Sequence, residues 1–137
     1  VIDKANEYGI SDSLKLTGKL SKKQWITLSE DYDIFINTTD FDNHPVSVIE
    51  AMALGMPVVS TKVGGIPYLV EHRVNGMLVP PDNADKFVEE IENLISDSEL
   101  VKNITTEARK KVEDFDWDTV KNKWFNLIDP YDRANVN

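Results

Sequence analysis

Apolar and polar positions along the chain follow two different periods. Short apolar runs closed by glycine or polar residues predict β-strands, and longer stretches with apolar residues three or four positions apart predict helices. The strands expected on this basis cover residues 14–17, 33–37, 56–60 and 77–79. The expected helices cover residues 1–8, 21–29, 45–54, 66–71, 83–95, 99–112 and 117–128.

Residues at the ends of these segments support the assignment. Ser21, Asp97 or Ser98, and Asp116 each precede a helical pattern and have side chains that cap helix N-termini. Pro45 suits the first position of a helix, where its missing N–H leaves no hydrogen bond unmade. We therefore expect these residues to mark helix starts.

Strands and helices alternate with short connections, which is typical of βαβ units. We expect an α/β fold with a Rossmann-like parallel sheet and flanking helices, forming one domain over residues 1–128. Residues 129–137 are polar and are expected to form a tail. The helix at 83–95 should bury one apolar face, made of Phe87, Ile91, Leu94 and Ile95.

Composition and charge narrow the classes of function. The net charge of −9 argues against nucleic acid and against an anionic bilayer as partners. The sequence has no cysteine, and its two histidines, His44 and His72, lack the spacing of metal ligands, so we expect no metal site. No apolar run approaches the ~20 residues that span a bilayer, and we expect a cytoplasmic protein.

The candidate chemistry lies around the helix expected at residues 45–54, which Gly55 should end. In parallel α/β sheets, ligands bind beyond the carboxyl ends of the strands, where Asp42 is expected. The helix N-terminus offers unpaired N–H groups to an anion such as a diphosphate. Asp42 and Glu50 could each accept hydrogen bonds from the two hydroxyls of a sugar diol. This arrangement suits a nucleotide sugar.

Each of these features has a purely structural alternative. Ser47 and Glu50 have the spacing of a capping box. Asp42 and Asn43 both favour turns, and on their own a turn would be the preferred interpretation. Gly64–Gly65 could be only a tight turn with positive φ.

Two further clusters are better explained by structure than by function. Trp117, Trp124 and Phe125 lie at helical spacing and are expected in the core. The run Arg109–Lys111 could grip a phosphate, but a solvated face that favours its helix C-terminus is preferred.

The order and spacing of several motifs resemble the C-terminal half of retaining GT-B glycosyltransferases, the family called glycosyl transferases group 1, or family 4. The resemblance covers most of the chain. It is carried by Glu50-Ala51-Met52-Ala53, Gly55, Pro57-Val58-Val59, Gly64-Gly65, the segment from Asn75 to Pro80, and Phe115-Asp116-Trp117.

The resemblance implies transfer of a hexose from a nucleoside diphosphate sugar, with retention of anomeric configuration and without a metal or other cofactor. It assigns contact with the donor sugar to Asp42 and contact with the ribose diol to Glu50. The donor diphosphate would lie against the segment from His44 through Pro45 and Val46 to Ser47. The backbone N–H groups of Val46 and Ser47 would face it.

The chain departs from the family pattern in three respects. Asp42 stands where the family has a longer Glu, which leaves the sugar contact less defined than the ribose contact. After Gly64–Gly65 the family has a Glu where this chain has Tyr68, and we transfer no role to that position. The Arg and Lys that grip the diphosphate upstream of this segment, together with the N-terminal domain, have no counterpart in the 137 residues.

We therefore expect a fragment, truncated at its N-terminus, that binds donor weakly and is inactive alone. Its partners would be the donor and the missing domain, and any peripheral membrane contact would come only through that domain. The alternative is a non-catalytic nucleotide-sugar binding module or a GT-B relative such as an epimerase.

Overall fold

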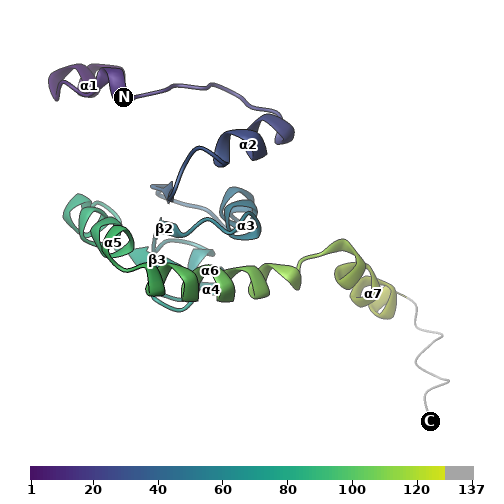
Figure 1. Cartoon of the computed structure of the whole chain (residues 1–137). Coiled ribbons are helices and arrows are strands. Elements are labelled where there is room, and N and C mark those ends of the chain that lie inside the picture. The colour runs from purple at the N-terminus through teal and green to yellow at the C-terminus, as the bar shows by residue number, and fades with distance from the viewer. Residues whose placement is uncertain (129–137) are drawn as a thin grey trace, which may run out of the picture. The chain divides into compact units, whose positions relative to one another are not determined.

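The computed structural model describes residues 1–128 (Figure 1) and divides the chain into two compact units. The first unit, Val1–Asp31, contains helices α1 and α2 and a 3-10 turn. Their bounds are Ile2–Glu7 for α1, Ser11–Ser13 for the 3-10 turn η1, and Lys22–Ser29 for α2.

The second unit begins at Tyr32 and contains the sheet and five helices among the residues described. Its elements in chain order are β1 Phe35–Asn37, α3 Val46–Ala53, β2 Val58–Thr61, α4 Ile66–Leu69, β3 Met77–Val79, α5 Ala84–Ser96, α6 Ser98–Glu113 and α7 Trp117–Ile128.

The sheet is parallel, with the order β1-β2-β3. Ile36 is in register with Val59, and Val59 is in register with Met77. All four residues of the central strand β2 are buried, as expected for a parallel strand covered on both faces. The predicted α/β fold with a parallel sheet and flanking helices is confirmed.

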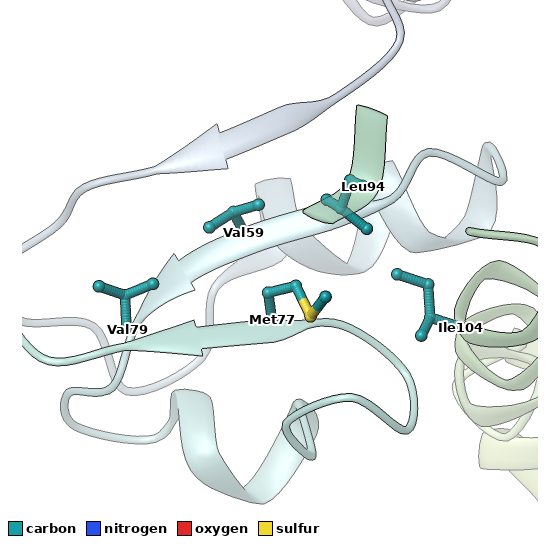
Figure 2. Close-up of a cluster of buried hydrophobic side chains, with 5 residues drawn as sticks. All are labelled: Val59, Met77, Val79, Leu94 and Ile104. Atoms are coloured by element: carbon teal, nitrogen blue, oxygen red, sulfur yellow. The ribbon is translucent and has the colours of Figure 1, made fainter. Parts of the chain in front are cut away.

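Apolar side chains from two strands and two helices form the main core cluster (Figure 2). Val59 of β2 and Met77 and Val79 of β3 pack with Leu94 of α5 and Ile104 of α6, and all five are buried. This contact fixes α5 and α6 against the sheet. Helix α3, which follows β1, contacts β1 and β2 and also packs against α6, so both the sheet and α6 hold it in place.

Capping residues are the most accurately predicted local features. Ser21 forms a full capping box with Gln24 at the start of α2. Asp97, rather than Ser98, caps α6 by accepting the N–H of Leu100 at 2.9 Å. Asp116 accepts the N–H of Asp118 at the start of α7, at 2.8 Å. These bonds satisfy N–H groups that a helix start leaves unpaired.

The Asp97 cap leads to a quantitative prediction. Asp97→Ala should lower the free energy of unfolding by about 1 kcal/mol, because the first turn of α6 loses its side-chain acceptor. Urea denaturation of the whole chain measures this change. Glu92→Ala, which removes an exposed acidic side chain from the middle of α5, is the matched control and should change stability by less than about 0.5 kcal/mol. Equal losses in the two variants would contradict the capping role.

The strand predicted at residues 14–17 is wrong. The backbone at Leu14 is extended, with φ −105° and ψ 119°, but no described strand pairs with this segment. Leu14 and Leu16 are exposed. An apolar run can adopt an extended backbone, yet a strand also needs a ladder partner, and the sequence pattern does not supply one.

Two smaller corrections concern helix ends and helix faces. Helix α4 ends at Leu69 and not at Glu71, because the backbone turns extended at Val70. The side chain of Asn75 then accepts the N–H of Glu71 at 2.7 Å. On α5, Ile95 is 75% exposed, so it lies outside the buried face that the pattern assigned to it.

The core placement of the aromatic residues of α7 is also wrong. Trp117, Trp124 and Phe125 are 69%, 54% and 64% exposed, and no residue of α7 is buried among those described. Trp124 and Phe125 line a shallow apolar groove of about 370 Å³ together with Lys121 and Ile128. Helical spacing predicts an apolar face but does not specify what covers it. The predicted tail at 129–137 lies outside the described residues.

Candidate functional site

The loop that carries Asp42 follows β1 and lies directly on the double glycine that follows β2. The N–H of Gly65 donates to the carbonyl oxygen of Asp42 at 2.7 Å. A Cβ at Gly64 would lie 2.3 Å from the Asp42 carbonyl oxygen, and a Cβ at Gly65 would lie 2.0 Å from that of Asn43. Gly64 also has φ +52°, so it forms the predicted turn. Both glycines are needed mainly because any side chain at these positions would clash with the backbone of the loop that carries Asp42.

Hydrogen bonds between the ends of β1 and β2 hold the base of the same loop. Asn37 Nδ2 donates to Ser60 Oγ at 3.0 Å. Thr61 Oγ1 donates to the carbonyl oxygen of Thr39 at 2.6 Å. These four residues were not predicted from the sequence, although polar side chains at the ends of two adjacent parallel strands were the available signal. Hydrogen bonds therefore hold the loop both at its base and at Asp42.

Helix α3 begins one residue later than predicted. Pro45 is the N-cap, with φ −72° and ψ 85°, because this ψ lies outside the helical range. The carbonyl of Pro45 accepts the N–H groups of Val48 and Ile49, at 3.0 and 3.1 Å. The N–H groups of Val46 and Ser47 donate to no backbone acceptor among residues 1–128. They form the free end of the helix dipole.

The capping-box alternative does not fit this geometry. Ser47 is the second helical residue, and α3 has no side-chain cap. Ser47 and Val46 have exposed side chains, whereas Pro45 is buried. The first turn of α3 therefore offers its backbone donors at the surface, anchored by a buried proline.

Asp42 forms the turn that its residue type favours. Its Oδ1 accepts the N–H of His44 at 2.9 Å, and the residue is half-buried. A carboxylate has two oxygens and about four lone pairs, so one local bond leaves acceptor capacity for a ligand. The turn and a binding role are therefore compatible, because the same bond fixes the direction of the carboxylate.

Glu50 is half-buried on the second turn of α3. It lies four residues beyond Val46, a rise of about 6 Å along the helix axis. The predicted residues Asp42, His44, Pro45, Val46, Ser47 and Glu50 thus all lie in or next to the start of α3, at the carboxyl end of the parallel sheet.

An aromatic contact that the sequence analysis did not predict joins this segment to the end of α6. The rings of His44 and Phe115 lie with centroids 6.4 Å apart and planes at 86°, an edge-to-face arrangement. Phe115 belongs to the Phe115-Asp116-Trp117 motif, so the signal was present but its partner was not identifiable. His44 itself is exposed.

The side chains of Arg109 and Lys110, from the basic run on α6, bond to other groups of the protein. Arg109 Nη1 donates to the carbonyl oxygen of Ala53, the last residue of α3. Lys110 pairs with Glu107 at 2.5 Å, and Arg109 Nε pairs with Glu113 at 3.3 Å. A guanidinium at a helix C-terminus stabilises the negative end of the helix dipole. These contacts favour the solvated face over the phosphate grip.

Other classes of site have no support in the part of the chain that the structure describes. Residues 1–128 contain no cluster of three or more potential metal ligands. The second histidine, His72, instead accepts the N–H of Leu78 at its Nδ1, at 3.1 Å. None of the described helices has the length and apolar character needed to cross a membrane.

Comparison with known proteins identifies the fold and the family. The structure of Alr3699/HepE from Anabaena, solved in complex with UDP-glucose, is 26% identical and superposes with a TM-score of 0.83 over 92% of this chain and 35% of its own. The C-terminal domain of a glycosyl transferase group 1 family protein from Francisella tularensis is 25% identical, with a TM-score of 0.70 over 81% of this chain and 57% of its own. The fold is that of the C-terminal domain of a GT-B glycosyltransferase.

The model of the glycosyl transferases group 1 family matches residues 1–111, so the chain belongs to that family. The amylovoran biosynthesis glycosyltransferase AmsK of Erwinia amylovora is 34% identical over 110 residues, which is 76% of this chain and 27% of AmsK. The chain spans about a third or less of the length of the curated relatives that it matches most strongly.

Proposed function

We propose that this chain binds the donor of a retaining hexosyltransferase, a nucleoside diphosphate sugar, at the start of α3. The observation that carries the proposal is the Asp42 loop seated on Gly64–Gly65, next to a helix start whose Val46 and Ser47 N–H groups have no backbone partner. The UDP-glucose complex of the Anabaena relative supports the choice of ligand class.

The proposed roles follow the positions of the residues. The diphosphate accepts hydrogen bonds from the N–H groups of Val46 and Ser47, where the helix dipole favours negative charge. Glu50, deeper along α3, accepts both hydroxyls of the ribose diol. Asp42, on the other side of the helix start, accepts a hydroxyl of the transferred sugar.

These contacts account for stabilisation of the leaving group. When the bond between the anomeric carbon and the diphosphate breaks, negative charge develops on the phosphate oxygens. Fixed N–H donors stabilise that charge without moving a proton. Transfer also requires an acceptor held against the anomeric carbon, and we assign that task to the part of the enzyme outside this chain. The chain alone should bind donor without transferring the sugar.

The test is a titration of the chain with UDP and GDP, followed by NMR. Two charge-assisted hydrogen bonds to the diphosphate alone support a dissociation constant on the order of 1 mM, and the ribose contact of Glu50 lowers it for UDP and GDP to roughly 10–100 μM. The amide signals of Val46 and Ser47 should shift most. Uridine, which lacks the diphosphate, is the control ligand and should leave these two signals unchanged. Absence of shifts with both nucleotides, or equal shifts with uridine, would refute the proposed site.

A further inference from the structure

Phe115 is a motif residue that the proposed donor contacts do not use. It lies just beyond the last residue of α6, and its ring meets the ring of His44 edge-to-face at 6.4 Å. We propose that Phe115 is a positioning residue for the donor site, because its ring fixes His44 and thereby the turn that leads into α3. This inference rests on the proposed function and adds a residue from a distant segment to it.

The position of Phe115 is set from both sides of its turn. Upstream, α6 is anchored by the buried residues Ile104, Ala108 and Val112. The N–H of Phe115 donates to the carbonyl of Val112 at 3.0 Å. Downstream, Asp116 begins α7 by accepting the N–H of Asp118. The ring therefore projects from a constrained turn and not from a free chain.

Helix α6 is also fixed directly to the helix that carries the site. The bond from Arg109 to the carbonyl of Ala53 ties α6 to the C-terminal end of α3, while the contact of Phe115 with His44 lies at the N-terminal end. The two helices are thus joined near both ends of α3. Such a two-point attachment restricts how the start of α3 can shift relative to α6.

His44 connects this attachment to the residues that are proposed to contact the donor. Its backbone N–H donates to Asp42 Oδ1 at 2.9 Å, and the next residue is the buried N-cap Pro45. An exposed imidazole without a neighbour samples several rotamers, whereas an edge-to-face pair selects one. When the free chain already holds this rotamer, less conformational entropy is lost on ligand binding.

Two substitutions at Phe115 distinguish the effect of the aromatic ring from the effect of the apolar volume. Phe115→Leu keeps an apolar side chain and removes the ring, while Phe115→Tyr keeps the ring. Phe125→Leu makes the same change at an exposed aromatic residue of α7 and serves as the matched control. Phe115 is 42% exposed, so these variants should fold.

Two measurements are made on each variant. NMR of the nucleotide-free chain records the imidazole signals of His44, with those of His72 as internal reference. Titration with UDP gives the affinity. Phe115→Leu should remove the ring-current shift of His44 and weaken UDP binding roughly threefold, which is the size of a typical aromatic pair interaction. Phe115→Tyr should restore both values, and Phe125→Leu should alter neither.

A double-mutant cycle with His44→Ala completes the test. Phe115→Leu should have no further effect on UDP affinity when the imidazole is absent, because the two side chains act as one unit. Additive losses would overturn the inference, as would unchanged UDP affinity in Phe115→Leu. Failure of the unmodified chain to bind UDP would instead refute the proposed function, and the positioning role would fall with it.

Discussion

Gly65→Ala is expected to displace the Asp42 loop and to weaken UDP binding by at least about fivefold. The new Cβ would lie 2.0 Å from the carbonyl oxygen and 2.7 Å from the carbonyl carbon of Asn43, both backbone atoms that cannot rotate away. Gly65 has φ −83°, which alanine adopts freely. The effect is therefore steric. Over-packing of this kind costs about 1–3 kcal/mol.

Gly55→Ala provides the matched control for this substitution. Gly55 has φ +77° and no heavy atom within 4 Å of an added Cβ. Alanine there should cost about 1 kcal/mol in backbone strain but leave the Asp42 loop in place. Urea denaturation and UDP titration of both variants separate the two effects. If Gly65→Ala retains full UDP affinity, the seating of the loop on the double glycine is unimportant for the site.

Features set by residues close together in the sequence were predicted correctly, whereas those that depend on contacts between distant segments were not. Ser21 and Asp116 were recognised as caps because a cap bonds to an N–H only two or three residues away. The parallel sheet followed from the alternation of elements. By contrast, the segment at 14–17 has a strand pattern but no described ladder partner, and the exposed Trp124 and Phe125 have an apolar pattern but no buried environment.

The candidate site shows the same division. The residues of the site lie within one stretch of nine, from Asp42 to Glu50, so sequence spacing alone brought them together. What positions them comes from far along the chain. Gly65 admits the loop and Phe115 contacts His44. Neither partner could be paired with the loop from periodicity, because a contact between distant segments depends on the packing of whole helices and strands.

Glu50→Ala should weaken UDP binding by about tenfold to a hundredfold, which is the largest loss we expect from a single polar side chain. A hydrogen bond to a charged group contributes about 1.5–3 kcal/mol, and each 1.4 kcal/mol is a factor of ten in affinity. Glu50→Gln keeps the shape but removes the charge and should give an intermediate loss. Titration calorimetry or NMR measures both. Glu71→Ala, at an exposed acidic residue after the double glycine, is the control and should bind normally.

The ribose assignment can be separated from a general effect of Glu50 on helix α3. If the carboxylate holds the ribose diol, 2′-deoxy-UDP should bind more weakly than UDP to the unmodified chain. In Glu50→Ala the two nucleotides should bind equally, because the group that distinguishes them is gone. A preference for UDP that survives in Glu50→Ala would place the ribose contact elsewhere. Equal affinity for the two nucleotides in the unmodified chain would do the same, and Glu50 would then act on the site only through the structure of α3.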